Sequence, residues 1–486
     1  MRGFARWLTI SGAGAVALAV STAGIIPASA APSAISRPAV SARPSARDWP
    51  TVAGRAVTAR AVAARADQTG SVSPTPASGT PALVHTGSSS SFQNVGQIVQ
   101  CGDTMYAVGT FSQVSWNGTT YNRSNIFSFS ASAPYTVNPW DPSVNGVIES
   151  ITLTSNCNHA YIGGKFSEVD GSPAAHIAEI RTYNTAPVKD FASNASSTVD
   201  TVLLAGSHLL VGGVFNKING SKNPYYVSLN PSTGLDDGYL KLDISGHYSY
   251  PKAAAIGTGV YNQQLSPATY GSYVLAEGVF TKVQGFARQQ IFMMRLASSR
   301  GQVTTWTSSD FLQYCTHKVP FYVHDAAWAP DGSAIYVGDT GLAPWNWNGQ
   351  FPLTGICDAA AAFPANRASV SPEWINYTGC DSFYSIAADS SAVYAAGHPR
   401  WSENPDACNA EGPGAIPDRG LQGLSPTSGD TLLNSSGTAL YTMARANATD
   451  MLVTSVGLWI ASSNRYGSDS CGGVGGHAGI CFLPYS

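Results

Sequence analysis

The chain has 486 residues, enough for two or three average domains or for one large all-β domain. Only 11% of its residues are charged, whereas glycine is abundant at 49 residues, a composition typical of short strands and many turns. Eight of the 26 basic residues but only two of the 29 acidic residues precede Ser91, so the rest of the chain carries a formal charge of −9. This acidic balance argues against a nucleic-acid partner, which requires clustered Lys and Arg side chains.

The first 30 residues have the pattern of a secretory signal peptide. Arg2 and Arg6 precede an apolar run from Leu8 to Ile26, and the small residues that follow form a cleavage site before Ala31. A transmembrane anchor is the alternative interpretation, but Gly and Ser interrupt the apolar run. No later segment has about 20 consecutive apolar residues. We therefore predict a secreted, extracellular protein without a membrane span after cleavage.

Residues 31–80 are predicted to be a disordered linker. They are rich in Ala, Pro, Ser, Thr and Arg, and Trp49 is their only aromatic residue. Such a segment buries too little apolar area to offset the entropy that ordering removes. Both a cleaved pro-segment and a cell-wall spacer fit this composition, and the sequence does not distinguish them.

Residues 81–486 contain seven copies of a repeat, which is clearest at a glycine-rich strand. The first four copies read YAVGTF, YIGGKF, LVGGVF and LAEGVF, and they begin at Tyr106, Tyr161, Leu210 and Leu275. Three weaker copies begin at Tyr336, Tyr394 and Trp459. The aligned glycine of the fifth copy is Gly338, and the last copy has Ser462 instead. Residues 261–272 look like an insertion in the fourth copy.

Each copy predicts four short strands in roughly 50 residues, bounded by turn residues. Seven sheets of this size are the pattern of an all-β, seven-bladed β-propeller. The last copy ends at its third strand, so we expect residues 81–86 to supply the fourth strand. This N-terminal strand would close the last blade and remove an open sheet edge.

The repeats resemble the delta-60 repeat propellers, a β-propeller family of unknown function found in exported bacterial proteins. The GGxFxxVxG units at Gly163–Gly171 and Gly212–Gly220 carry the resemblance, which covers roughly residues 81–486. The C-terminal third is similar to a secreted bacterial subgroup, through GHPRW from Gly397 and FLP from Phe482. The resemblance implies a fold and an export route but no catalytic residues. Kelch repeats are a weaker match, because their downstream Tyr and Trp spacing is missing.

Eight cysteines in an exported chain predict up to four disulfides. We expect each cysteine to pair with its nearest neighbour in the sequence, and Cys471–Cys481 is favoured because it closes a short loop. No two cysteines have C-x2-C spacing, which argues against a zinc site. The candidates are Cys101, Cys157, Cys315, Cys357, Cys380, Cys408, Cys471 and Cys481.

Catalytic and cofactor signatures are not evident in the sequence. It has no nucleophile elbow, phosphate loop, dinucleotide fingerprint, sialidase box or HxxxH pair. The segments DDG at Asp236 and DGS at Asp331 look like short calcium loops, but tight turns explain them better. We expect no cofactor, and Ca2+ held by channel carboxylates is the alternative.

Polar residues at the starts of the predicted innermost strands form the first group of candidate ligand-binding residues. By repeat alignment they are Glu149, Asp200, His324, Asp325 and Asp381. Carboxylates that converge on a channel mouth can bind Ca2+ or raise one another's pKa values for acid–base chemistry. The alternative interpretation is that they only line the channel and are hydrated by ordered water.

The second group of candidates lies in the sixth repeat and comprises His398, Arg400 and Trp401, with Trp374 nearby. Aromatic faces beside polar side chains suit sugar rings, whereas rings that only fill gaps between blades are the alternative. His398 and Arg400 can also be interpreted as a structural hydrogen-bonding corner.

The sequence therefore predicts a monomeric extracellular binding or scaffold module for a glycan, a cell-wall component or a protein. The alternative is a secreted carbohydrate-active hydrolase or lyase that uses carboxylates at the channel mouth. Fold alone does not decide, because propellers host both functions. Two carboxylates about 5–10 Å apart in an open funnel favour the enzyme, and a funnel plugged by side chains favours the scaffold.

Overall fold

The computed structural model describes residues 71–85, 93–247, 257–312, 315, 322–341, 355–443, 448–463 and 478–486. The predicted signal peptide and most of the predicted linker lie outside these ranges. The chain divides into residues 1–62 and residues 63–486, and all that follows concerns the second unit. Apart from one 3-10 turn at Ser309–Leu312, every element in the described ranges is a strand. The all-β prediction is confirmed, and no described helix is long and apolar enough to cross a membrane.

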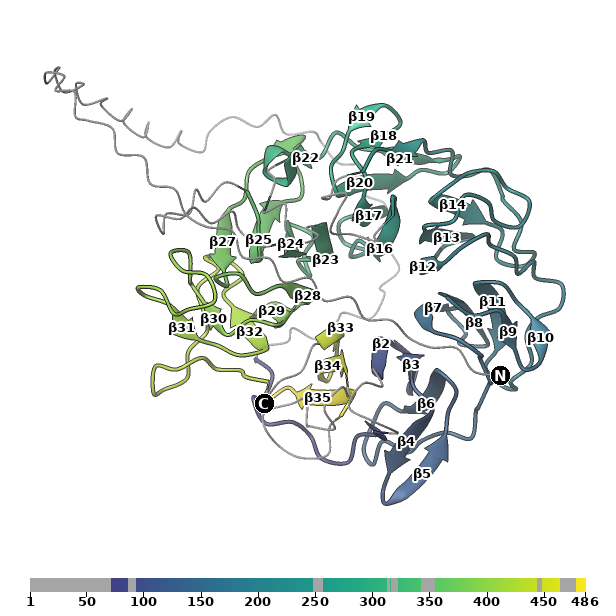
Figure 1. Ribbon diagram of the computed structural model, residues 1–486, viewed down its shortest axis with the longest axis horizontal. Coiled ribbons are helices and arrows are strands. Elements are labelled where there is room, and N and C mark those ends of the chain that lie inside the picture. Colours follow the sequence, from purple (N-terminus) through teal and green to yellow (C-terminus); the bar gives the residue numbers. More distant parts are fainter. Residues whose placement is uncertain are drawn as a thin grey trace, which may run out of the picture. The chain divides into compact units, whose positions relative to one another are not determined.

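In the part of the chain that the structure describes, seven main antiparallel sheets have an innermost strand each (Figure 1). In chain order these strands are β2 (Asn94–Cys101), β7 (Ile148–Leu153), β12 (Val199–Ala205), β16 (Gly259–Leu265), β23 (Tyr322–Trp328), β28 (Phe383–Ala388) and β33 (Ala448–Thr454). Each innermost strand contacts the next one, and β33 contacts β2. The arrangement is propeller-like, as predicted. We number the sheets one to seven in this order.

Second and third strands follow outward in every sheet. The second strands are β3 (Thr104–Thr110), β8 (His159–Gly164), β13 (His208–Gly213), β17 (Tyr273–Val279), β24 (Ala334–Thr340), β29 (Val393–Gly397) and β34 (Gly457–Ser462). The third strands are β6 (Ile126–Ser130), β11 (Ile177–Arg181), β14 (Tyr226–Leu229), β20 (Ile291–Leu296), β25 (Ala359–Pro364), β32 (Leu421–Leu424) and β35 (Ile480–Pro484). Only sheets four and five have a fourth strand among the described residues, β21 (Gly301–Val303) and β27 (Trp374–Tyr377). In sheets one, two, three and six the predicted fourth segment is present as a single antiparallel β-bridge to the third strand, such as Ile180 with Pro187, and is too short to count as a strand.

Short strand pairs branch off between the second and third strands. They include β4 (Gln113–Trp116) with β5 (Thr119–Asn122), β9 (Glu168–Val169) with β10 (Ser172–Pro173), and β18 (Lys282–Val283) with β19 (Phe286–Ala287). The two turn residues of each pair, such as Asp170-Gly171, both have positive φ. That conformation suits the right-handed strand twist and favours glycine at the second position, which explains the last glycine of the repeat.

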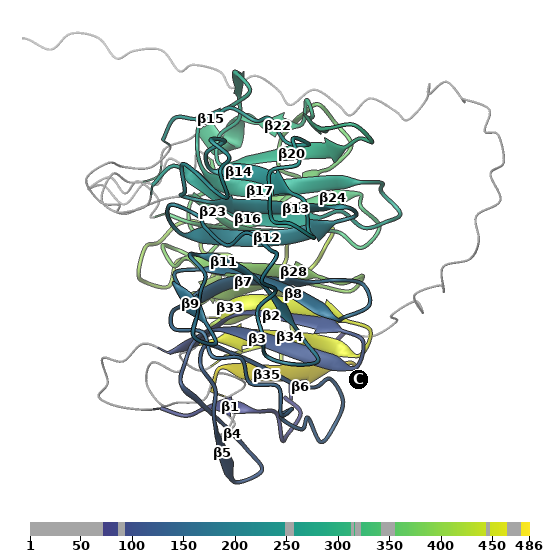
Figure 2. The same ribbon diagram turned by 90° about the vertical axis from the view of Figure 1, so that its right-hand side faces the viewer.

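The remaining short strands lie in the same peripheral layer. They are β15 (Ile244–Ser245), β22 (Thr307–Ser308), β26 (Ser369–Val370), β30 (Trp401–Ser402) and β31 (Ile416–Pro417). In both views of the ribbon, β4 and β5 lie well outside the innermost strands (Figures 1 and 2).

Apolar side chains from the facing surfaces of neighbouring sheets make up the core. One cluster joins sheet one to sheet seven, with Val95 and Phe129 on one side and Trp459 and Phe482 on the other. The rings of Trp459 and Phe482 stack at 4.4 Å, and Phe129 meets Trp459 edge-on at 5.5 Å. Each such buried side chain contributes roughly 1.5–3 kcal/mol, so the first and last repeats are held together strongly.

Residues near the start of the described chain cover the outer edge of β35. The backbone N–H of Ser73 donates to the Pro484 carbonyl (2.7 Å), and that of Ala77 donates to the Phe482 carbonyl (2.8 Å). Val72 is only 1% exposed and packs in the core of sheets six and seven. The folded part therefore includes residues that we assigned to the disordered linker.

We predicted that residues 81–86 close the last sheet, but the described ones, 81–85, lie elsewhere. Strand β1 (Ala82–Leu83) pairs with β4 in sheet order β1-β4-β5, although Leu83 N also donates to the Ala478 carbonyl (2.7 Å). The error has a physical cause. Pro74 and Pro76 made the segment read as disordered, but proline is tolerated on an edge strand, where its missing N–H is not needed.

Three of the predicted disulfides are confirmed: Cys101–Cys157, Cys315–Cys357 and Cys380–Cys408. Cys481 is also disulfide-bonded, and its predicted partner Cys471 lies outside the described residues. The first bridge connects the end of β2 to the β7–β8 turn, so it joins sheets one and two covalently.

Candidate functional site

Every innermost strand carries a β-bulge near its start, in the same register of all seven described sheets. One residue per strand is left without a partner on the second strand: Gly96, Glu149, Asp200, Tyr261, His324, Tyr384 and Thr449. A bulge inserts an extra residue and re-aims its side chain. These bulges place one residue per sheet at the end of the channel where the innermost strands begin, which we name the channel mouth.

The repeated glycines are needed because of these bulges. Five of them lie opposite the bulge, where an added Cβ would lie 2.0–2.3 Å from a backbone carbonyl oxygen at, or one residue before, the start of the innermost strand: Gly109, Gly164, Gly213, Gly278 and Gly397. Only glycine allows the two backbones to approach so closely. In sheet five the residue opposite the bulge is Asp339, so the alignment of Gly338 was wrong by one position.

Glu149, Asp200 and Lys165 form the charged side of the channel mouth. The Lys165 Nζ donates to Glu149 Oε1 at 2.7 Å. Burial, together with the neighbouring Glu149 charge, raises the pKa of Asp200 to about 8, although Lys165 and the backbone N–H of Val214 oppose this shift. The Asp200 Oδ2 atom is buried and has no hydrogen-bond partner among the described residues. Asp200 therefore holds a proton at neutral pH and can donate it in a hydrogen bond.

Five aromatic side chains, which we name the aromatic arc, line the other side. Ring centroids are 6.4 Å apart for Tyr261 and Tyr322, 5.3 Å for Tyr322 and His324, and 5.0 Å for His324 and Tyr384. His398 ends the arc, with its Nδ1 atom 3.0 Å from the Tyr384 hydroxyl. The arc spans sheets four to six and presents ring surface next to Asp200.

Most of the aromatic arc is uncharged near neutral pH. Burial lowers the pKa of His324 to about 4. Burial also raises the pKa values of Tyr322 and Tyr384 to about 12, and it raises that of Tyr261 further. The channel mouth thus combines neutral ring surface, a protonated carboxyl group and one ion pair.

The channel holds a cavity beyond the mouth, toward the far ends of the innermost strands. A cavity of about 300 Å³ is lined by innermost-strand residues of sheets one to four, among them Gln97, Thr152, Thr201 and Gln263. Its lining mixes polar side chains, such as Gln97 and Thr152, with apolar ones, such as Val99 and Leu203.

Asp325 was predicted at the mouth but lies one residue beyond the bulge, where its carboxylate joins three sheets. Its Oδ2 accepts hydrogen bonds from Ile386 N (2.8 Å) and Ser385 Oγ (3.2 Å) of β28. Its Oδ1 accepts from Asn262 Nδ2 (2.6 Å) and Gln264 Nε2 (3.3 Å) of β16. At 6% exposure and with these partners, Asp325 holds neighbouring sheets together.

Side chains at the same position, one residue beyond the bulge, also link other neighbouring sheets. Gln97 accepts from Ile151 N (2.6 Å), and Asp450 accepts from Ile98 N (2.8 Å). The second contact connects sheet seven to sheet one. Position in the repeat therefore separates side chains at the mouth from side chains that link the sheets.

Asp381 was also predicted at the mouth, but it lies three residues before the bulge residue Tyr384 and is paired with Arg400. The Arg400 Nε and Nη2 atoms donate to its two carboxylate oxygens at 2.8 Å each. Arg400 also donates to Asn409 Oδ1 (2.8 Å) and stacks 4.6 Å from the centre of the Trp401 ring. Arg400 is therefore part of a structural hydrogen-bonding corner, but its partner there is Asp381 and not His398, as the alternative interpretation had it.

Of the second candidate group, only His398 joins the aromatic arc. Trp374 is buried and donates from Nε1 to the Pro426 carbonyl (3.0 Å), so its ring fills space in the core. Trp401 lies on the peripheral strand β30 and carries Arg400 on one face. The structure therefore brings together Glu149, Asp200, His324 and His398 of the predicted residues.

Sequence reasoning missed Lys165, Tyr261, Tyr322 and Tyr384. Tyr261 was assigned to an insertion, whereas the structure places Tyr261 to Leu265 within β16. A signal was present: each bulge residue directly follows an apolar residue, as in Val199-Asp200 and Val260-Tyr261. Extending the repeat alignment into the innermost strand would have found both missed bulge tyrosines.

No described group of three or more His, Cys, Asp or Glu side chains is arranged to hold a metal ion. Of the carboxylates that suggested Ca2+, Glu149 and Asp200 lie together at the mouth, whereas Asp325 and Asp381 lie at other positions of the repeat. We therefore do not assign calcium to this site.

Comparisons with known proteins give similarity of fold only. No protein-family description matches the sequence, and no curated protein is significantly similar to it. The structure of U3-55K has a TM-score of 0.46 at 10% identity, covering 84% of this chain and 100% of that one. The crystal structure of the RRP9 WD40 repeats has a TM-score of 0.46 at 11% identity, and the match covers 85% of this chain and 99% of that one. The extracellular domain of the putative one component system BT4673 from B. thetaiotaomicron has a TM-score of 0.41 at 9% identity. The match covers 81% of this chain and 38% of that one. At these values the similarities carry no information about ligand or chemistry.

Proposed function

We propose that the chain is a secreted seven-bladed β-propeller of the delta-60 repeat type that binds a neutral glycan at its channel mouth. The contact of β33 with β2 supports the blade number, and the GGxFxxVxG units support the family. The three disulfides fit an oxidising compartment outside the cytoplasm.

The observation that carries the proposal is the aromatic arc beside Asp200. Sugar rings present apolar C–H faces, which pack on aromatic rings, and hydroxyl groups, which need donors and acceptors. Protonated Asp200 supplies a donor, and the Glu149 carboxylate supplies an acceptor whose charge Lys165 balances. Among the described residues of the mouth, a strongly charged ligand would find only that ion pair to match it.

The proposal is tested with the full mature chain and three neutral trisaccharides: cellotriose, chitotriose and mannotriose. Calorimetric titration should show binding of at least one of them, and Tyr384→Ala should weaken it at least tenfold by removing a ring of the arc. Phe286→Ala is the matched control, because Phe286 is a 56% exposed aromatic residue on the peripheral strand β19. No binding, or equal binding by Tyr384→Ala and the control, would refute the proposal.

A second candidate function is glycan hydrolysis or lysis at the same site. It is favoured by one observation, the protonated Asp200 beside the ion-paired Glu149 carboxylate. An acid with a raised pKa next to a carboxylate is the arrangement that general acid–base catalysis uses. Product analysis after incubation with the same trisaccharides separates the two functions. Turnover that Asp200→Asn abolishes while binding persists would select the enzyme.

A further inference from the structure

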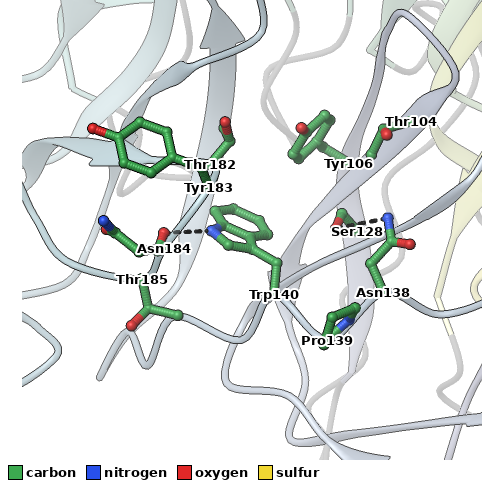
Figure 3. Close-up of a pocket in the computed structure, with 10 residues that line it drawn as sticks. All are labelled: Thr104, Tyr106, Ser128, Asn138, Pro139, Trp140, Thr182, Tyr183, Asn184 and Thr185. Atoms are coloured by element: carbon green, nitrogen blue, oxygen red, sulfur yellow. Dashed lines mark hydrogen bonds between the residues drawn. The ribbon is translucent and has the colours of Figure 1, made fainter.

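A second pocket lies between sheets one and two (Figure 3), and its strand register places it at the end of the fold opposite the channel mouth. Its walls come from the start of β3, the end of β6 and the segment after β11. Thr104 pairs with Cys101 at the far end of β2, and Arg181 pairs with His159 at the corresponding end of sheet two. This pocket, which we name the inter-sheet pocket, is therefore separate from the aromatic arc.

The inter-sheet pocket is held in shape before any ligand arrives. The Trp140 Nε1 donates to the backbone carbonyls of Asn184 (2.9 Å) and Arg181 (3.1 Å). The Tyr106 ring meets Trp140 edge-on at 5.5 Å, and Asn138 Nδ2 donates to Ser128 Oγ (3.2 Å). Fixed side chains lower the entropy cost of binding.

The Cys101–Cys157 disulfide joins the two sheets that form the pocket. Cys101 ends β2 of sheet one, and Cys157 lies in the β7–β8 turn of sheet two. The Thr182 hydroxyl, which lines the pocket, donates to the Cys157 carbonyl. The distance between the walls is therefore fixed by a covalent bond as well as by packing.

The lining of the pocket indicates the class of ligand. None of its ten lining residues is charged, and three of them are aromatic. Three polar groups there have no hydrogen-bond partner among the described residues: the hydroxyls of Thr104 and Thr185 and the side-chain NH2 of Asn184. Tyr183 is 65% exposed, so its ring is free to pack on a ligand. The volume of the inter-sheet pocket, about 370 Å³, falls in the range of small-molecule sites, about 300–1,000 Å³.

We propose that the inter-sheet pocket is a second binding site, specific for a neutral sugar unit. Ring surface and uncharged donors match the two chemical features of such a unit, whereas a charged ligand would find no counter-charge. This inference does not depend on the channel mouth. If both sites bind, the protein holds two sugar units at opposite ends of the fold, which raises its avidity for a polymeric glycan.

The experiment is hydrogen–deuterium exchange of the full mature chain with each neutral trisaccharide at about 10 mM, since single sites for small sugars bind at millimolar levels. Trigalacturonate is the charged comparison. We expect at least one neutral trisaccharide to protect peptides that cover 135–145 and 178–188, and trigalacturonate to leave them unprotected. The readout needs no variant, so it does not depend on a substitution that unfolds the chain.

Variants then assign the protection to the pocket. Tyr183→Ala should weaken the protection at least fivefold, and Phe286→Ala should leave it unchanged, because both rings are exposed but only Tyr183 lines the pocket. Tyr384→Ala should also leave it unchanged, which keeps failure at the mouth distinct from failure here. The inference is overturned if no neutral sugar protects these peptides, if trigalacturonate protects them equally, or if Tyr183→Ala behaves as the control does.

Discussion

Asp200 in sheet three and Asp325 in sheet five occupy adjacent positions of the repeat unit. Burial raises the pKa of Asp200 to about 8 and that of Asp325 to about 7. Asp325 accepts hydrogen bonds from three sheets. Asp200, the bulge residue, instead leaves a buried oxygen without a partner among the described residues. One position in the repeat thus builds the fold, and the position before it is available to a ligand.

The difference follows from the bulge. Side chains along a strand alternate between its two faces, and one extra residue changes which of them face a given side. Buried polar groups in folded proteins are normally hydrogen-bonded, so one that is not calls for an explanation. We explain Asp200 by the ligand proposed above, and the following predictions test whether the two positions differ as we infer.

The largest effect is expected for Asp325→Asn. Four of its hydrogen-bond partners are N–H groups, so the new amide NH2 would face another donor and leave a buried bond unmade. We expect a loss of about 3 kcal/mol in the free energy of unfolding. Denaturant unfolding at pH 7.5 measures it, with Asp200→Asn as the matched substitution. Equal losses in the two variants would contradict the comparison.

Glu277→Met should stabilise the protein. Glu277 is 0% exposed and neither carboxyl oxygen has a described hydrogen-bond partner, so burial raises its pKa well above the usual range. Replacing an unpartnered buried polar group by an apolar one of similar length should add about 1–2 kcal/mol to the free energy of unfolding.

The control for that substitution is Gln263→Met. Gln263 is also buried, but it donates to the Leu210 carbonyl (3.1 Å) and accepts from the Tyr226 hydroxyl (2.7 Å). It should therefore destabilise the fold in the same unfolding assay. A stabilising effect of both changes would mean that hydrogen-bond partners do not matter here.

Asp450→Asn should cost less than about 1 kcal/mol, because its amide oxygen can still accept the backbone N–H of Ile98, the contact between the two sheets. Asp450 occupies the same repeat position as Asp325 but accepts from Ile98 N of the next sheet, with fewer partners. The same denaturant series measures it. A loss as large as that of Asp325→Asn would show that the contact between sheets seven and one determines the loss of stability, and not the number of hydrogen bonds at this position.

The smallest loss of stability is expected for Asp200→Asn, and the effect of this substitution should depend on pH. The pKa of Asp200 in the folded state, about 8, exceeds its ordinary value of 3.8, so the folded state binds the proton more tightly. Its contribution is complete below about pH 4 and is lost as the pH rises through about 8. Between pH 5 and pH 8.5, the free energy of unfolding should fall less steeply with rising pH in Asp200→Asn than in the unchanged protein. Parallel curves would exclude the raised pKa.

Much of the fold was predictable because its signals are local. Apolar runs, turn residues and glycines repeat along the chain, and each sheet forms from consecutive strands, so the propeller-like all-β class was readable. Three disulfides were predictable for the same reason, because each links neighbouring segments. The N-terminal contact was misplaced to 81–86 because Pro74 and Pro76 made the segment that does contact β35 look like linker.

The sequence by itself determined the repeat, the strands and which residue types lie near each strand start. Only the tertiary structure decided which of those side chains reach the channel mouth, because a bulge shifts the alternation of a strand by one residue. That shift separates Asp200 from Asp325 and brings Tyr261, Tyr322 and Tyr384 into one arc. The inter-sheet pocket was invisible in the sequence for a related reason: its walls come from two repeats, and only packing sets them side by side.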